Sequence, residues 1–210
     1  MPLDLEEQEQ VAELKAWWRQ HGNLIVTTIV AAALAFSAWQ GWRWYQASQA
    51  GQAAGVYESL VRAAQTADAK ALRDAAGTLI ESYPRTLYAS MGALVAARFH
   101  FDRNDLKAAK TQLQWVVDKS PSEDFRDLGR LRLAAIVLDE KAYDEALKLL
   151  DAKHGPAYDA QYAALRGDVL VAKSQPAEAR AAYKLALDKA TKEQGAFRET
   201  VRMRLEALGG

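Results

Sequence analysis

The chain has 210 residues, no cysteine, and 27 basic side chains against 27 acidic ones. The lack of cysteine excludes disulfide bonds, thiol catalysis and cysteine-based zinc sites. The balanced charge gives no reason to expect nucleic acid as a partner, because proteins that bind phosphate carry a surplus of basic residues.

Residues 1–22 are predicted to form a short amphipathic segment. The stretch from Leu5 to Arg19 contains no glycine or proline and is rich in helix-forming residues. Val11, Leu14 and Trp18 share one face of such a helix, and acidic residues fill much of the remainder. A docking role on a basic partner and a solvated acidic tail both fit this pattern.

Residues 23–45 are predicted to be a transmembrane anchor. No residue from Leu24 to Trp39 is charged, and tryptophans flank the run at both ends, as in the aromatic belts of membrane interfaces. A helix from Leu24 to Trp42 would be roughly 28 Å long, close to the hydrocarbon thickness of a bilayer. A buried core helix is disfavoured because soluble helices of this length rarely lack a polar face. A cleaved signal peptide is disfavoured because the leading segment is acidic and no clean cleavage site follows the run.

The basic residues beside the anchor bear on its orientation. Lys15 and Arg19 precede it and Arg43 follows it. Because basic residues are retained on the cytoplasmic side, two against one favours a cytoplasmic N-terminus. The opposite orientation, with the large domain in the cytosol, remains open on these residues alone.

Small residues recur along one face of the anchor, at Ala33, Ser37 and Gly41. Small side chains allow a second helix to approach closely within lipid. These three residues are therefore predicted to pack against a partner helix, although alanine and glycine are also common in membrane helices generally.

Residues 46–210 are predicted to form tetratricopeptide-like helical hairpins, which makes the fold class all-α: one transmembrane helix followed by an α-solenoid. Three hairpins show a small residue in each helix, twelve positions apart and separated by a turn, and a large residue four positions later. The residues predicted to pack the two helices together are Ala97, Ala109, Ala134, Ala146, Gly167, Ala179 and Tyr183. Residues 52–83 fit the pattern only as a degenerate pair, and residues 195–208 as a closing helix.

The first helices of such hairpins are expected to line a concave groove that binds a peptide or a helix. The repeat register predicts that the residues facing this groove are Met91, Leu94, Arg98, Phe101, Leu128, Leu131, Leu138, Gln161 and Asp168. The alternative is that several of these side chains belong to the core.

The sequence shows no arrangement of residues that indicates catalysis. The three histidines lie in separate segments, and no metal, nucleotide or nucleophile motif occurs. We therefore expect no enzyme activity, no catalytic or metal-binding residues, and no cofactor.

The order of these parts resembles the YfgM family, the ancillary subunits of the bacterial Sec translocon. The most specific matches are Gly41-Trp42-Arg43 at the end of the anchor, Leu165-Arg166-Gly167-Asp168, and Val201-Arg202-Met203-Arg204-Leu205. The resemblance implies a single-pass type II protein of the cell inner membrane with its repeat domain in the periplasm. It also implies association with the SecYEG channel and the membrane-anchored chaperone PpiD, near translocating polypeptides.

The expected function is thus a non-enzymatic adaptor at the Sec translocon that links it to periplasmic chaperones and emerging proteins. The alternatives are a holdase-type chaperone that binds unfolded clients in the repeat groove, and a general tetratricopeptide scaffold.

Overall fold

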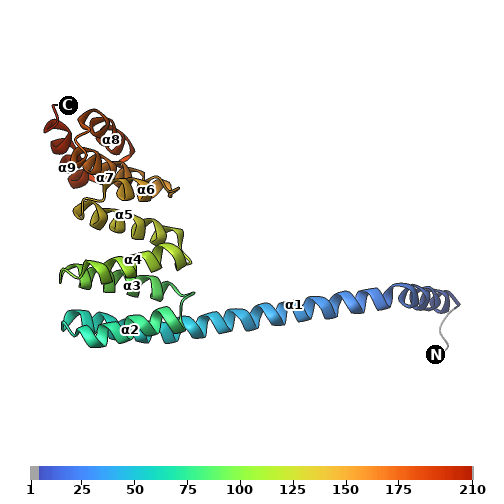
Figure 1. Ribbon diagram of the computed structural model, residues 1–210. Helices are drawn as coiled ribbons and strands as arrows, with labels where there is room; N and C mark the ends of the chain where they lie inside the picture. The colour runs from blue at the N-terminus through green and yellow to red at the C-terminus, as the bar shows by residue number, and fades with distance from the viewer. Residues whose placement is uncertain (1–4, 210) are drawn as a thin grey trace. The chain divides into compact units, whose positions relative to one another are not determined.

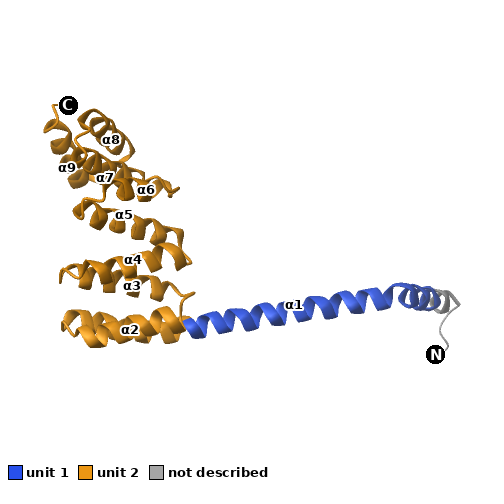
Figure 2. Cartoon of the chain, viewed as in Figure 1, with its two compact units in different colours: residues 1–49 blue, residues 50–210 orange. Residues whose placement is uncertain are grey.

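The computed structural model describes residues 5–209, with side chains from Gln10 onward. That part of the chain consists of α-helices and one short 3₁₀ helix, with no strand, and divides into two compact units, residues 1–49 and 50–210 (Figures 1 and 2). The helices are α1 Leu5–Gln65, α2 Ala69–Ser82, α3 Leu87–Phe101, α4 Leu106–Lys119, α5 Glu123–Asp139, α6 Tyr143–Leu150, the 3₁₀ helix η1 Pro156–Tyr158, α7 Asp159–Ala172, α8 Pro176–Lys189 and α9 Gly195–Glu206.

The first unit is the N-terminal part of α1. The helix is unbroken through Gly41, Gly51 and Gly55, and its last residues, from Ala50, belong to the second unit. Within the described residues, α1 is the one helix long and apolar enough to cross a membrane.

The second unit contains four helical hairpins that share one turn geometry. The turns contain Ala67, Asn104, Lys141 and Ser174, each with a backbone φ between 60° and 63°. In every turn the next residue donates its N–H to the carbonyl five positions earlier, at 2.9 to 3.1 Å. This is the Schellman pattern, which satisfies the free carbonyls at the end of a helix.

The four turns identify four repeats, whereas the pattern of small and large residues in the sequence identified three. The left-handed residues are spaced by 37, 37 and 33 positions along the chain. The first hairpin, formed by residues 50–65 of α1 with α2, is therefore a structural repeat of the same kind as the second (α3 and α4), third (α5 and α6) and fourth (α7 and α8). The predicted all-α, tetratricopeptide-like solenoid is confirmed.

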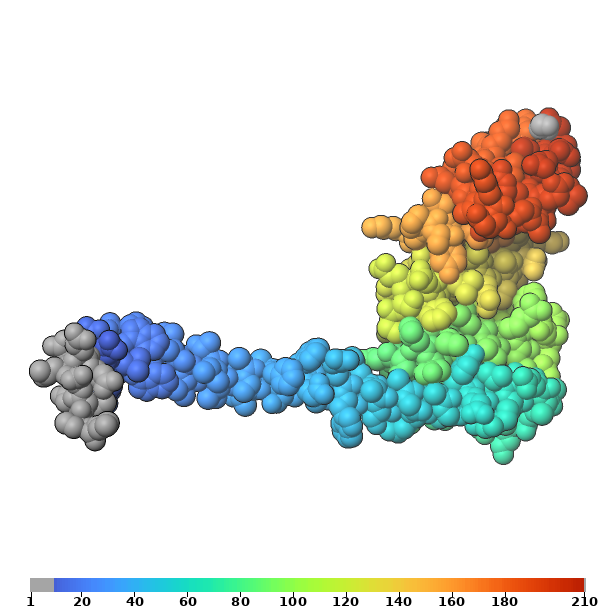
Figure 3. Space-filling view, turned by 180° about the vertical axis from the view of Figure 1, so that it is seen from behind, coloured from blue at the N-terminus to red at the C-terminus, as the bar shows by residue number. Residues whose placement is uncertain are grey.

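The hairpins of the second unit stack in chain order, and α9 packs against α8 at the end of the stack (Figures 1 and 3). Contacts also join the first helices of successive hairpins, α3 to α5 and α5 to α7. These helices consequently share one side of the stack, where the groove was predicted.

Side-chain caps fix where several helices begin. Asp68 accepts the N–H groups of Lys70 and Ala71 at the start of α2, and Asp105 accepts that of Ala108 at the start of α4. Such caps satisfy N–H groups that have no partner inside the helix.

Candidate interaction surfaces

The apolar stretch of α1 exposes its side chains along its length. Leu24 is 71% exposed, Leu34 67% and Trp44 74%. The hydroxyls of Thr27, Thr28 and Ser37 each donate to the carbonyl four residues earlier, at 2.7 to 2.8 Å. The hydroxyl protons are therefore satisfied within the helix, and these three residues add no unpaired donor to its apolar surface.

The three small residues predicted on this helix leave its surface open. Ser37 donates its hydroxyl to the carbonyl of Ala33, so this side chain lies along the helix. A Cβ atom added at Gly41 would meet no atom within 4 Å. This face therefore has the low profile that a closely packed second helix requires.

In the second unit, two adjoining pockets lie along α3. The α1–α3 pocket has a volume of about 470 Å³ and is lined by α3 residues, by Tyr57 and Ala64 of α1, and by Arg103 and Arg132. The α3–α5 pocket has a volume of about 460 Å³. Its lining residues are Ala97, Arg98, Phe101, Leu113, Arg132, Ala135, Ile136 and Asp139. Arg98 and Arg132 line both pockets, and together we call the two the α3 groove.

The charged side chains of the α3 groove differ in how they are compensated. The Arg98 Nε atom lies 2.8 Å from Asp102 Oδ1, and the Arg103 guanidinium stacks over the Phe99 ring at 3.5 Å. Arg132 makes no ion pair or hydrogen bond within the described part of the chain. Partial burial lowers the pKa of its guanidinium, the charge of Arg98 lowers that pKa further, and Tyr158 opposes the change. The groove thus carries an uncompensated positive charge above apolar side chains.

The comparison with known families covers residues of both units. The sequence profile of a family described as "Tetratricopeptide repeat-like domain" matches residues 15–210. The chain belongs to this family.

Three relatives can be aligned with this chain over most of their length, and each is named "Ancillary SecYEG translocon subunit". The protein from Neisseria gonorrhoeae is 29% identical over 209 residues, which cover 99% of this chain and 100% of the relative. That from Haemophilus influenzae is 27% identical, covering 89% and 91% of the two chains. That from Escherichia coli is 28% identical, covering 84% and 85%. These relatives confirm the predicted resemblance, and no solved structure matches the chain.

The residues predicted to pack the helices of each tetratricopeptide-like hairpin all lie in the interior. Ala109, Ala134, Ala146 and Ala179 have no exposed surface, and Ala97, Gly167 and Tyr183 are also buried. A Cβ atom at Gly167 would lie 2.4 Å from the Tyr183 ring, so the aromatic ring occupies the space that glycine leaves.

The residues predicted to face a groove are divided by the structure. Met91, Leu94, Arg98 and Phe101 of α3 line the α3 groove. Leu128, Leu131 and Leu138 pack against the central core and line neither pocket. On α5 the groove is instead lined by Arg132, Ala135, Ile136 and Asp139.

This division has a physical reason. The three leucines of α5 pack on a core that includes residues of α6 and α7, whereas the equivalent residues of α3 line open pockets. Translating the α3 register to α5 therefore selected leucines that belong to the core.

Gln161 and Asp168, the predicted groove residues on α7, lie in other surroundings. The Gln161 Oε1 atom is buried without a hydrogen-bond partner. Asp168 accepts hydrogen bonds from the Tyr183 hydroxyl at 2.7 Å and from Arg204 at 2.6 and 2.9 Å. Asp168 thereby ties α7 to α8 and α9.

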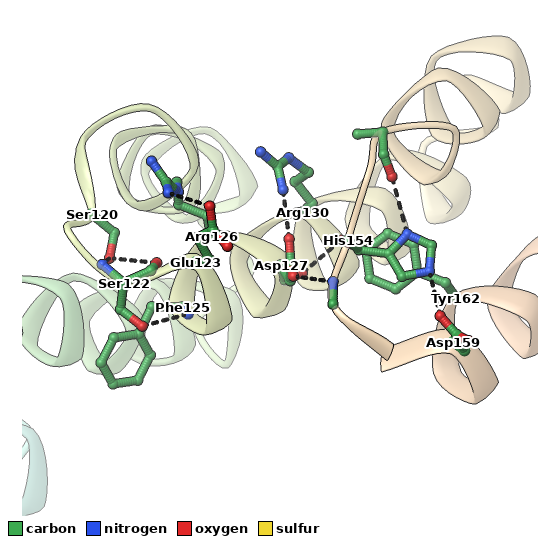
Figure 4. A network of polar contacts seen from close by, with 12 residues as sticks. Ser120, Ser122, Glu123, Phe125, Arg126, Asp127, Arg130, His154, Asp159 and Tyr162 are labelled. Atoms are coloured by element: carbon green, nitrogen blue, oxygen red, sulfur yellow. Dashed lines mark hydrogen bonds and ion pairs between the residues drawn. The ribbon is translucent and has the colours of Figure 1, made fainter. Parts of the chain in front are cut away.

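A buried carboxylate that the sequence patterns did not single out joins the third and fourth hairpins. Asp127 is 3% exposed, and its side chain accepts hydrogen bonds from Arg130 at 2.7 Å and from the Gly155 N–H at 2.8 Å (Figure 4). The Tyr162 hydroxyl donates to the Asp127 carbonyl at 2.9 Å, and the His154 ring stacks on Tyr162. Burial and the Asp127 charge raise the pKa of Tyr162 to about 12. The spacing of Asp127 and Arg130 on one helix was the only signal available in the sequence.

Residues 10–209 contain no cluster of three or more histidine, aspartate or glutamate side chains placed to hold a metal ion. His21 stacks on Trp17, His100 lies 3.3 Å from Asp105, and His154 lies 3.4 Å from Asp159. The histidines therefore have local structural partners, and the surfaces described above are suited to binding other proteins.

Proposed function

We propose that the chain is a non-enzymatic adaptor at the Sec translocon, anchored in the inner membrane by α1. The observation that carries this proposal is similarity over most of the chain to proteins named ancillary SecYEG translocon subunits. The exposed apolar surface of α1 and the repeat architecture of the second unit support it, since they supply an anchor and a scaffold for protein contacts.

In this proposal the contact with SecYEG lies within the membrane and uses the face of Ala33, Ser37 and Gly41. A helix that presents small residues gains van der Waals contacts when another helix approaches closely. The hydroxyl of Ser37 is already bonded within α1, so its burial against a partner leaves no unpaired donor.

Site-specific photo-crosslinking in native membranes tests this contact. Crosslinkers at Ser37 and Gly41 are expected to give products with SecYEG subunits. Ala35 is a matched control, because it lies about 200° around the helix from Ala33. Equal products from Ala35 and Ser37, or none from Ser37 and Gly41, would contradict docking through this face.

The proposed orientation places the N-terminus in the cytoplasm and the repeat domain in the periplasm. Two basic residues before the apolar run and one after it support this orientation. Protease added to spheroplasts is expected to degrade the repeat domain. Survival of that domain while a known periplasmic domain is degraded would reverse the orientation.

The repeat domain is proposed to hold PpiD and to lie close to translocating polypeptides. The α3 groove is the surface we assign to such a partner, because it combines apolar lining with a charge that has no partner of its own. A photo-crosslinker at Phe101 should give products with PpiD or with a secreted chain, and a crosslinker at Arg73 on α2 serves as control.

A holdase is the second candidate function, and the exposure of Phe101 in the α3–α5 pocket favours it. If the groove binds unfolded clients, Phe101→Glu should weaken suppression of client aggregation by the full chain. Leu131 is unsuitable for this test because it packs on the core. Unchanged suppression by a folded Phe101→Glu variant would exclude this form of the holdase.

A further inference from the structure

The α3–α5 pocket combines an apolar floor with cations at its edge. Leu113 and Ile136 are buried in the core beneath it, at 2% and 5% exposure. Phe101, which is 38% exposed, also lines the pocket. A volume of about 460 Å³ is large enough for the side chains of a short peptide segment.

Arg132 differs from most arginines of the repeat domain. Seven of the others pair with a carboxylate: Arg62, Arg98, Arg126, Arg130, Arg166, Arg202 and Arg204. Arg132 has no such partner among the described residues. The residue is exposed, but the surrounding protein partly desolvates its guanidinium, and Arg98 lies close enough for the two charges to repel. A bound anion would relieve both effects.

Nearby acidic groups limit what the groove accepts. Asp102 is already paired with Arg98, and Asp139 lies two turns from Arg132 on α5. A segment with several acidic residues would place some of them beside Asp102 or Asp139, which would repel them. A segment with a single carboxylate can place it at Arg132 and keep uncharged residues beside these aspartates. The two pockets adjoin and share Arg98 and Arg132. A bound peptide can therefore extend from these arginines into both pockets.

We propose that the α3 groove binds an internal segment of a partner protein that presents one acidic side chain between apolar ones. The apolar side chains occupy the floor formed by Leu113, Ala135 and Ile136, and the carboxylate accepts hydrogen bonds from Arg132. An arginine suits this role because its planar guanidinium matches a carboxylate with two parallel hydrogen bonds. This inference rests on the proposed function in one respect: the segment belongs to a chaperone or to an emerging chain.

The probe for the test is the blocked hexapeptide acetyl-GLEFLG-amide, and isothermal titration calorimetry measures its binding to the full chain in detergent micelles. The comparison peptides are GLQFLG and GLKFLG, blocked in the same way, and GLQFLG with a free C-terminal carboxylate. We expect GLEFLG to bind about tenfold more tightly than blocked GLQFLG, because one charge-assisted hydrogen-bond pair is gained. GLKFLG should bind most weakly, and the preference for glutamate should decrease with added salt.

Variants connect this preference to Arg132. Arg132→Gln should abolish the difference between GLEFLG and GLQFLG, and Arg132→Lys should retain part of it. Arg73→Gln, an exposed arginine on α2, should leave the difference unchanged. Circular dichroism verifies that each variant is folded, and the lysine variant keeps the test valid if the glutamine variant is not.

Several results would overturn the proposal. They are equal binding of GLEFLG and GLQFLG, an unchanged preference in a folded Arg132→Gln chain, and no binding of GLEFLG up to about 1 mM. Tighter binding of the peptide with a free carboxylate would assign the groove to a chain end instead. If crosslinks from Ser37 to SecYEG persist while the peptide preference is absent, this inference fails and the proposed function stands.

Discussion

The first and second hairpins share a turn but distribute side-chain volume in opposite ways. The comparison uses the positions seven before, five after and nine after the left-handed residue of each turn. In the second hairpin these are Ala97, Ala109 and Leu113, and in the first they are Leu60, Leu72 and Ala76. All six are buried, so both arrangements fill the space between their helices.

The extra volume of the first hairpin is accommodated by the helix that follows it. A Cβ atom at Gly92 of α3 would lie 2.4 Å from Leu79 and 3.4 Å from Leu60. Glycine at this position therefore leaves room for leucines from the neighbouring hairpin. The comparison teaches that both hairpins keep the same turn and a filled interior, while the residues that fill the interior differ.

The largest expected effects come from changing volume at the equivalent positions. Leu60→Ala should lower the free energy of unfolding by about 2–5 kcal/mol, because a fully buried leucine leaves a cavity. Ala97→Leu in the second hairpin should lower it by about 1–3 kcal/mol through overpacking. Chemical denaturation of the full chain in detergent measures both. If Leu60→Ala lost less than about 1 kcal/mol, Leu60 would not supply the packing described.

Substituting one glycine in the first hairpin and one in the fourth should change stability in opposite directions. Gly77 has open space beside it, and Gly167 faces the Tyr183 ring. Gly77→Ala on α2 should raise the unfolding free energy by about 0.5–1 kcal/mol, since a Cβ there meets no atom within 4 Å. Gly167→Ala on α7 should lower it by about 1–3 kcal/mol, because the new methyl group collides with the Tyr183 ring.

Adding Tyr183→Leu to Gly167→Ala recreates the alanine–leucine pair of the second and third hairpins. The double variant should be more stable than the sum of the single changes predicts, by about 1 kcal/mol. Simple additivity in this double-mutant cycle would show that Gly167 and Tyr183 do not compensate for each other's volume.

High pH should weaken the later hairpins through their buried tyrosines. Burial and Asp127 raise the pKa of Tyr162 to about 12, and burial and Asp168 raise that of Tyr183. A raised pKa means that the folded state holds the proton more tightly than the unfolded state. The stability from Tyr162 is therefore complete below pH 10 and decreases as the pH rises towards 12.

Tyr162→Phe isolates this contribution. The variant should lose less stability than the parent between pH 10 and 12 in denaturation measured at each pH. Identical pH profiles for the two chains would remove Tyr162 as a source of alkaline sensitivity.

The smallest effects are expected at the turns. Ala67→Gly and Lys141→Gly should each raise the unfolding free energy by about 0.5–1 kcal/mol, which is the left-handed penalty less the added entropy of unfolded glycine. Asn104→Gly should gain less, because asparagine tolerates this conformation. An equal gain at all three sites would show that side-chain identity does not set the strain in these turns.

The sequence predicted the later hairpins well because alanine, alanine and a large residue recur around turns rich in polar residues. It described the first hairpin only as degenerate, since Leu60 and Leu72 stand where small residues were sought. The shared backbone turn, which reveals the repeat, depends on a left-handed conformation of Ala67 that alanine does not signal.

The candidate site was predictable on α3 and not on α5. Apolar periodicity identifies which face of a helix is buried, but it does not say which neighbour covers that face. Leu131 and Arg132 are adjacent, and only the packing of α5 decides that the arginine reaches the groove while the leucine joins the core. Asp127 was missed for a similar reason, because one of its two hydrogen-bond donors, the Gly155 N–H, lies 28 residues away.

The most direct test of the account exchanges residues 23–45 for an unrelated transmembrane helix and measures co-purification with SecYEG from native membranes. We expect SecYEG to co-purify with the parent chain and to be lost from the exchanged chain, while PpiD remains bound to the repeat domain. Equal SecYEG recovery with both chains, or none with the parent chain, would contradict an adaptor that docks at the translocon through α1.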